Sequence, residues 1–136
     1  MLIGRTLFAL LAVLTSAALA QSWPAKPVRI VVAYPPGGGI DVMARQIAER
    51  LTGGWGQPVL VENKPGANTI VAADAVAKSA PDGYSVLMTT DATFSINPHL
   101  YARLPFDPQR DFIPVTMLVL LQQLLVAHPA TPFNDL

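Results

Sequence analysis

A glycine-rich loop between an apolar run and a helical pattern is the part of this sequence best suited to chemistry. The loop reads Tyr34-Pro35-Pro36-Gly37-Gly38-Gly39-Ile40-Asp41 and follows the β-branched run Val28–Val32. The first N–H groups of a helix have no intrahelical partner, and the helix dipole adds partial positive charge there. Three consecutive glycines carry no Cβ atoms that would keep a ligand away from that backbone. We therefore expect this loop to hold a small anion, most of all a carboxylate.

Two further loops are expected to meet the glycine loop. Open parallel sheets bind ligands at the carboxyl ends of their strands, and residues 34–41, 64–69 and 90–94 all follow predicted strands. Thr90, Asp91 and Thr93 offer hydroxyl groups and a carboxylate that suit hydrogen bonding to a polar ligand. Glycines also serve simply to permit a tight turn. The residues alone leave both interpretations of the glycine loop open.

Individual residues in these loops have ordinary structural alternatives. Asp41 could contact a ligand, but a helix N-cap is a sufficient structural role for it, and we favour that role. Tyr34 could stack on a ligand or form part of the core. The two histidines, His99 and His128, lack the companion spacing of a metal site or a hydrolase dyad, and we assign them no role. The glycine loop also lacks the nucleotide-binding patterns, and no G-x-S-x-G elbow is present.

The elements that would position these loops form an alternating pattern. The nearly continuous apolar character of the first strand indicates that both of its faces are covered. Apolar residues four apart, with Met43 first, give the first helix one buried stripe, and Gly53-Gly54 supplies its C-terminal stop. Such an order predicts an α/β fold with a right-handed, mostly parallel sheet. The predicted elements are strands at about Val28–Ala33, Val59–Glu62 and Tyr84–Thr90, and helices at about Asp41–Thr52 and Asn68–Ser79.

The rest of the chain follows a different pattern. Residues 91–114 alternate prolines with aromatic side chains, which predicts an irregular packed segment with one or two helical turns. Val115–Leu121 and Leu124–Ala127 are predicted to be strands. At the other end, residues 1–20 are typical of a secretory signal peptide. Arg5 supplies its positive charge, Leu7–Leu14 its apolar region, and Ala18-Leu19-Ala20 its cleavage site.

Composition excludes several classes of function. Cleavage after Ala20 removes Arg5 and leaves eight basic and nine acidic residues, a net charge of −1. That balance gives no basis for nucleic-acid binding, and no basic cluster indicates a membrane-surface patch. The chain contains no cysteine, which excludes disulfides, thiolate catalysis and cysteine-ligated metals. We expect an exported, near-neutral protein without a cofactor or a resident metal.

Five motifs in one order resemble a known family. The matching segments are Tyr-Pro-Pro-Gly-Gly-Gly-Ile-Asp at 34–41, Gly-Gln-Pro-Val-Leu-Val-Glu-Asn-Lys-Pro-Gly-Ala at 56–67, Ala-Pro-Asp-Gly-Tyr-Ser at 80–85, Ile-Asn-Pro-His-Leu-Tyr at 96–101, and Leu-Pro-Phe-Asp-Pro-Gln-Arg-Asp-Phe at 104–112. With them the chain resembles, from about Trp23 to Leu136, the Bug-type periplasmic substrate-binding receptors of tripartite tricarboxylate transporters.

The resemblance implies a two-lobed, Venus-flytrap receptor that holds a small carboxylic acid through backbone amides and bound waters. Such a receptor is a periplasmic, monomeric protein without enzymatic activity, and it delivers its ligand to the integral permease subunits of the transporter. The binding loops carried over by motif are 34–41, 67–69 and about 90–93. The ligand-binding residues implied are Tyr34, Pro36, Gly37, Gly38, Gly39, Asp41, Ala67, Asn68, Thr69, Thr90, Asp91 and Thr93.

The chain departs from the family pattern at two positions and in length. Gly66-Ala67-Asn68-Thr69 stands where Gly-Ala-Gly-Gly is frequent, and Ile40 stands where Ser or Thr is common. Two lobes of ordinary size do not fit into residues 21–136. We therefore expect an incomplete N-terminal lobe, truncated before the second lobe, with poor solubility and weak ligand binding.

Two alternatives from other classes stay open. One is a small exported α/β enzyme acting on an anionic substrate, with Asp41 or Asp91 as the acid or base. An Asp41→Asn change would separate the two readings, since a binding loop should largely survive it and a catalytic base should not. The other alternative is a structural exported module without a ligand.

Overall fold

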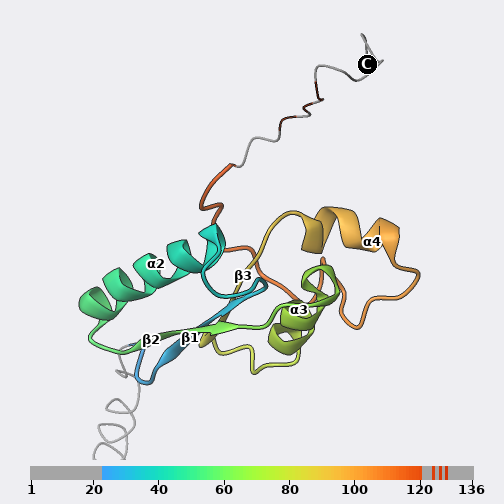
Figure 1. Ribbon diagram of the computed structural model, residues 1–136. Helices are drawn as coiled ribbons and strands as arrows, with labels where there is room; N and C mark the ends of the chain where they lie inside the picture. The colour runs from blue at the N-terminus through green and yellow to red at the C-terminus, as the bar shows by residue number, and fades with distance from the viewer. Residues whose placement is uncertain (1–22, 121–123, 125, 127, 129–136) are drawn as a thin grey trace, which may run out of the picture.

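A small parallel sheet forms the centre of the protein (Figure 1). The computed structural model describes residues 23–120, 124, 126 and 128, so the predicted signal peptide lies outside the described residues. Strand β1 (Val28–Val32) lies between β2 (Val59–Asn63) and β3 (Ser85–Met88), and both pairings are parallel. Val28 pairs with Val59, and Arg29 pairs with Ser85. The predicted parallel sheet is confirmed.

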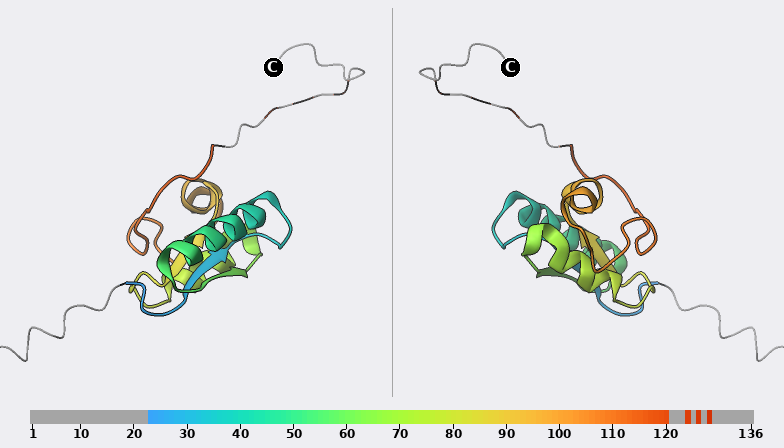
Figure 2. Two further views of the ribbon diagram at one scale, coloured as in Figure 1. Left: turned by 90° about the vertical axis from the view of Figure 1, so that its left-hand side faces the viewer. Right: turned by 90° about the vertical axis from the view of Figure 1, so that its right-hand side faces the viewer.

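Helices cover both faces of the sheet, as the apolar character of β1 predicts (Figure 2). Val28, Ile30 and Val32 face helix α2 (Gly39–Trp55), where they pack with Ala44 and Ala48. Val31 and Ala33 point to the opposite face and pack with Ala72 of helix α3 (Ile70–Ala77). This alternation is the two-residue period of a strand, with an apolar layer on each side.

Helix α2 (Gly39–Trp55) is longer than predicted at both ends. Its apolar stripe is confirmed, since Met43, Ile47 and Leu51 pack against the core. The predicted stop is wrong, because Gly53 and Gly54 lie inside the helix. The chain leaves the helix only at Gly56, whose φ of 67° is the left-handed value that a helix C-cap requires.

The second predicted helix is two separate elements. A short 3-10 turn, η2 (Ala67–Thr69), precedes α3 (Ile70–Ala77). The turn has left-handed backbone angles, with φ of 45° at Ala67, 48° at Asn68 and 77° at Thr69. A right-handed helix therefore cannot begin before Ile70, and α3 starts two residues later than the predicted helix did.

The segment after β3 is compact and irregular, as predicted. A π-helical turn, η3 (Ala92–Ile96), continues into the short helix α4 (Asn97–Leu100). Beyond it, three phenylalanine rings hold the chain to this part of the fold. Phe112 makes edge-on contacts with Phe94 and Phe106, at centroid distances of 5.2 and 5.5 Å. Such edge-on pairs are the favoured geometry for aromatic rings.

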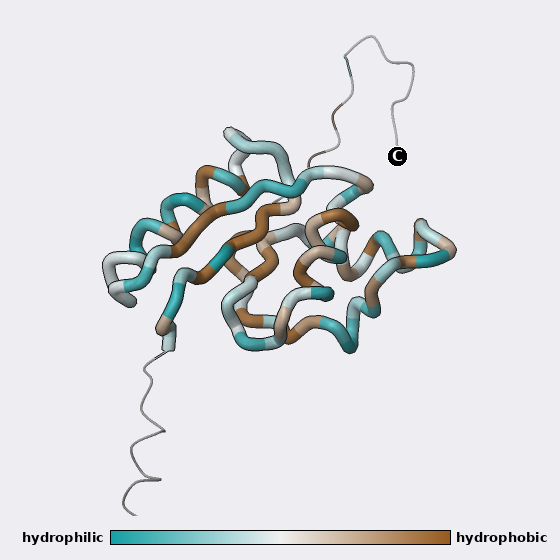
Figure 3. The backbone as a smooth tube through the Cα atoms, turned by 90° about the horizontal axis from the view of Figure 1, so that it is seen from below, coloured by the Kyte–Doolittle hydropathy of each residue, from teal (hydrophilic) through white to brown (hydrophobic). Residues whose placement is uncertain are grey.

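The strand predicted at Val115–Leu121 is wrong for its described part. Residues 115–120 have no regular secondary structure and leave the body of the fold (Figure 1), whose strands carry long apolar stretches (Figure 3). A strand needs a neighbour to accept and donate its ladder hydrogen bonds, and no strand is paired with these residues. Val115 and Leu120 are 81% and 78% exposed. Leu121 and residues 125 and 127 of the second predicted strand lie outside the described residues, while Leu124 and Val126 are described and have no regular secondary structure. Such exposure would cause the poor solubility expected from the sequence, which stays a prediction.

Candidate functional site

The three predicted loops lie together at the carboxyl edge of the sheet, joined by side-chain hydrogen bonds. The hydroxyl groups of Tyr34 and Thr90 are 2.7 Å apart, which ties the glycine loop to the chain after β3. The hydroxyl groups of Thr69 and Thr93 are also 2.7 Å apart, which ties the turn after β2 to the same segment. The expected convergence of these loops is therefore present among the described residues.

Asp41 is buried, with 3% of its surface exposed, and its carboxylate turns back toward the glycine loop. It accepts hydrogen bonds from the Gly37 backbone N–H at 2.8 Å, from Asn63 Nδ2 at 2.8 Å and from Arg45 Nε at 3.0 Å. The predicted N-cap role is wrong, because Gly38 occupies the N-cap and Asp41 lies in the first turn. Gly37, with φ of 87°, lets the chain enter the helix earlier than the sequence indicated. The Asp41 carboxylate thus ties the glycine loop to the first turn of α2.

Two residues that the sequence analysis missed complete this arrangement. Arg45 lies four residues after Asp41, and the ion pair between them was recognisable from that spacing. Asn63 ends β2 and also donates to the backbone oxygen of Tyr34, at 3.1 Å. An asparagine at a strand end carried no signal of its own, because its partners come from another loop.

The three donors lower the pKa of Asp41 from 3.8 to about 2, with the Arg45 hydrogen bond as the largest cause, followed by those of Gly37 and Asn63. Because the folded state prefers the ionised carboxylate, Asp41 stabilises the fold fully above its ordinary pKa. This contribution is lost as the pH falls through about 2. A carbon-detected NMR titration of the Asp41 carboxylate should give that value, and an Arg45→Ala variant should raise it. A titration near the ordinary value of 3.8 would contradict the arrangement.

The turn after β2 is held by a second set of buried polar groups. Asn97 is fully buried, and its Nδ2 donates to the backbone oxygen of Asn68 at 2.6 Å. Its Oδ1 accepts from Asn68 Nδ2, also at 2.6 Å. Thr93 is fully buried as well and lies 2.6 Å from Thr89, oxygen to oxygen. The sequence analysis missed Asn97 and Thr89, because only the fold brings them beside the turn.

A pocket of about 250 Å³ lies at the N-terminus of α2. Four predicted site residues line it, namely Tyr34, Pro36, Gly38 and Gly39, together with Pro35 and Ile40. No side chain caps this helix end, so the first-turn N–H groups are not used by a capping side chain. Of the other predicted residues, Gly37 donates its N–H to Asp41, while Ala67 and Asp91 are exposed on their loops. None of the three lines the pocket.

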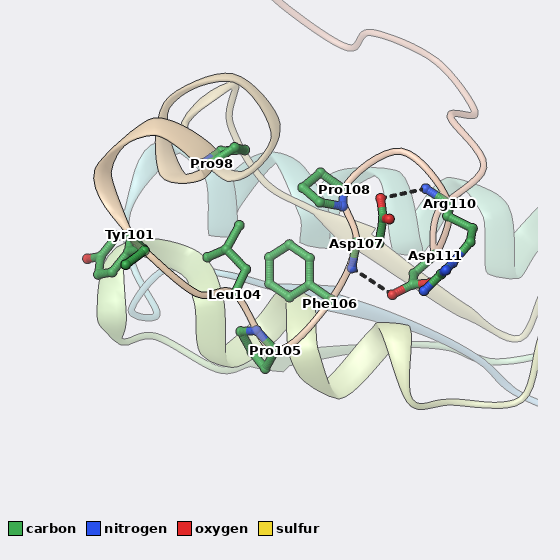
Figure 4. Close-up of a pocket in the computed structure, with 10 residues that line it drawn as sticks. Pro98, Tyr101, Leu104, Pro105, Phe106, Asp107, Pro108, Arg110 and Asp111 are labelled. Atoms are coloured by element: carbon green, nitrogen blue, oxygen red, sulfur yellow. Dashed lines mark hydrogen bonds and ion pairs between the residues drawn. The ribbon is translucent and has the colours of Figure 1, made fainter.

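A larger pocket, of about 520 Å³, lies away from the strand ends on residues 98–111 (Figure 4). Its carboxylates already have local partners. Asp107 accepts from the Arg110 backbone N–H at 3.1 Å, and its own N–H donates to Asp111 at 2.7 Å. None of the predicted site residues lines this pocket, and we do not consider it the candidate site.

Among the described residues, no group of three His, Cys, Asp or Glu side chains could hold a metal ion. Within the same part of the chain, no helix has the length and apolar character to cross a membrane.

The fold is that of part of a lobe of the periplasmic binding protein class. MatC from Rhodopseudomonas palustris, solved with bound malate, is 35% identical and superimposes with a TM-score of 0.64 over 68% of this chain and 32% of its own. The R. palustris protein Rpa4515, solved with adipate, is 36% identical, with a TM-score of 0.61 over 64% of this chain and 29% of its own. The periplasmic binding protein BugD is 39% identical, with a TM-score of 0.59 over 66% of this chain and 30% of its own.

Sequence comparison identifies the family within that class. The pattern described as the tripartite tricarboxylate transporter family receptor, TctC, matches residues 43–136, and the chain belongs to this family. A UPF0065 protein of Bordetella bronchiseptica is 42% identical over 86% of this chain and 36% of its own length. BugT of Bordetella pertussis is 38% identical over the same shares of the two chains. This chain therefore spans a little over a third of the length of these curated relatives.

Proposed function

We propose that this chain is the N-terminal part of an exported receptor that binds a small carboxylate at the carboxyl edge of its sheet. The observation that carries the proposal is the uncapped N-terminus of α2 beside the pocket of about 250 Å³. Relatives of the same fold solved with malate and adipate support a dicarboxylate as the ligand class. Family membership supports a receptor rather than an enzyme.

The N-terminus of α2 would hold one carboxylate group through backbone N–H groups. Helix dipole and unpaired N–H groups together favour an anion at this position. The negative charge of Asp41 does not cancel the attraction for an anion, because its carboxylate is turned inward and forms an ion pair with Arg45 at 3.0 Å. The hydroxyl groups of Tyr34 and Thr90 share one proton between them at 2.7 Å, which leaves the other free to donate to a ligand.

An acid–base role for Asp41 receives no support from these contacts. Its pKa of about 2 keeps the carboxylate ionised and a poor base at neutral pH, and three protein donors already occupy it. The proposal also includes a signal peptide cleaved after Ala20, which residues 1–20 predict. Its remaining parts are what the family implies, namely a periplasmic location, a monomeric receptor and delivery of the ligand to integral permease subunits.

The test is an NMR titration of the chain with malate, adipate and citrate up to millimolar concentrations, because binding by part of a receptor should be weak. Amide shifts should change at residues 37–41, 67–69 and 90–93, and the neutral dimethyl ester of malate should leave them unchanged. Equal shifts with the ester, or none with any carboxylate, would refute the proposal.

A Gly39→Pro variant isolates the role of the helix N-terminus. Gly39 is the first residue of α2, where proline removes an N–H group without breaking an intrahelical bond. The preceding Gly38 has φ of −77° and ψ of 166°, an extended conformation that proline accepts in its neighbour. The variant should keep its melting temperature and bind carboxylates roughly tenfold more weakly. Unchanged affinity would exclude the Gly39 N–H as a ligand contact.

A further inference from the structure

We propose that Asn97 is a positioning residue of the carboxylate site. Its buried amide holds the left-handed turn Ala67–Thr69 in place and fixes that turn against the segment after β3. The second and third binding loops would then act as one rigid unit. This inference rests on the proposed function only in taking a carboxylate as the ligand of these loops.

The turn needs such a support because its backbone is unfavourable for its residues. Ala67, Asn68 and Thr69 have φ values of 45°, 48° and 77°. Single asparagines tolerate this region, but a β-branched residue such as threonine is a true outlier there. Strained backbone of this kind persists only where its surroundings over-determine it. Glycine would adopt these angles without strain, but none of the three turn residues is glycine.

Asn97 supplies the contacts that offset this strain. Its Nδ2 donates to the Asn68 backbone oxygen at 2.6 Å, and its Oδ1 accepts from the Asn68 side chain at 2.6 Å. The same Nδ2 lies 3.4 Å from Thr69 Oγ1. One side chain, with none of its surface exposed, thus bonds to two consecutive left-handed residues. A buried amide with this set of partners has few alternatives, so it dictates the conformation of the turn.

The threonine hydroxyl groups extend this support into the third loop. Thr69, Thr93 and Thr89 form a chain of hydroxyl groups with oxygen separations of 2.7 and 2.6 Å. Thr93 lies in η3, and Asn97 begins α4 directly after it. A shift of the turn would therefore break contacts with both elements. The Asn68–Asn97 pair and the threonine chain together couple loop 67–69 to residues 89–97.

The experiment measures the turn itself, without any ligand, by amide hydrogen exchange and φ-sensitive couplings in the full chain. The Ile70 N–H donates to the Ala67 oxygen and closes the turn, so it is the reporter. In Asn97→Ala, exchange at Ile70 should be about tenfold faster, as for the loss of one to two hydrogen bonds. The couplings of residues 67–69 should lose their left-handed values, while those of α2 stay unchanged. Failure of ligand binding would leave these readouts untouched.

A double-mutant cycle and a matched control separate positioning from general destabilisation. Asn68→Ala removes one bond of the pair at an exposed residue and should accelerate Ile70 exchange to a smaller extent. In the Asn97→Ala background its effect should be clearly smaller, because the bond partner is already absent and only the poorer fit of alanine to the left-handed angle remains. Thr52→Val removes two hydrogen bonds at the far end of the sheet, to Ala48 and Val59, and should leave Ile70 unchanged.

Additive effects of the two asparagine variants, or acceleration at Ile70 in Thr52→Val, would overturn the proposal. So would left-handed couplings that persist in Asn97→Ala. If Asn97→Ala does not fold, Asn68→Ala alone decides the question, since unchanged exchange at Ile70 in that variant would also overturn it.

Discussion

Replacing Asp41 by alanine is expected to release the glycine loop and to lower the melting temperature by roughly 10 °C. The change removes the carboxylate that joins Gly37 in the loop, Asn63 at the end of β2 and Arg45 in α2 through one side chain. Asn63 and Gly37 then lose a bond that water must replace in a partly buried space. Thermal unfolding by circular dichroism measures the effect, and carboxylate titration measures its consequence for binding.

Arg45→Ala is the matched control for that prediction. It removes the Arg45 donor to Asp41, and a 3.2 Å bond from Arg45 to Asn63 Oδ1, at a side chain that is 54% exposed. The bonds that Gly37 and Asn63 donate to Asp41 stay in place. Because the Arg45 end of this pair is exposed, water can replace the lost donor, and the melting temperature should fall by only a few degrees. Equal losses in the two variants would mean that the loop is held by the ion pair, and that the internal bonds to Gly37 and Asn63 are unimportant.

The contacts of Asp41 also change how the Asp41→Asn experiment is interpreted. From the sequence, a binding loop should tolerate this change. In the structure all three partners of Asp41 are donors, so the new Nδ2 group would face at least one of them. A loss of binding in Asp41→Asn would therefore report a displaced loop as readily as a missing base. The Gly39→Pro variant avoids this ambiguity because it leaves these bonds in place.

The sequence predicted the elements whose physical cause is local. The apolar run of β1 requires cover on both faces, and Ile30 and Val31 indeed face opposite layers. The stripe of Met43, Ile47 and Leu51 could point in only one direction on a helix. Each of these features follows from periodicity within one segment.

The errors lie where a distant residue determines the conformation. The turn at Asn68 has the composition of a helix start, but its backbone is left-handed and bonds to Asn97 and Thr93, far along the chain. Asp41 has the spacing of an N-cap, but its partner Asn63 comes from another strand. Residues 115–120 have strand-forming composition without a neighbouring strand to pair with. At the turn and at Asp41, tertiary contacts overrode the local preference of the sequence. At residues 115–120, none of the described strands supplies the contacts that a strand needs.

Gly66→Ala is expected to destabilise the fold by about 3 kcal/mol. Gly66 has φ of 133° and ψ of 156°, a region that essentially only glycine occupies. A Cβ at this position would also lie 3.1 Å from Val71 Cγ2, which is closer than ordinary van der Waals contact. Because this residue leads directly into the left-handed turn, the altered backbone would misplace Ala67–Thr69 as well. Chemical denaturation gives the free energy of unfolding, and amide shifts of residues 67–69 report the displacement.

Two further variants show whether the loss in Gly66→Ala comes from its backbone angle or from contact with Val71. The first is a control at another glycine. Gly53→Ala lies inside α2 with nothing within 4 Å of its new Cβ, and it should stabilise the fold by about 0.5–1 kcal/mol. Val71→Ala in the Gly66→Ala background removes the contacting methyl groups and leaves φ unchanged. It should recover only a minor part of the loss, because the strained backbone angle is retained. If Val71→Ala restored all of the lost stability, glycine would be needed at position 66 only to avoid contact with Val71. The backbone angle of Gly66 would then not require glycine.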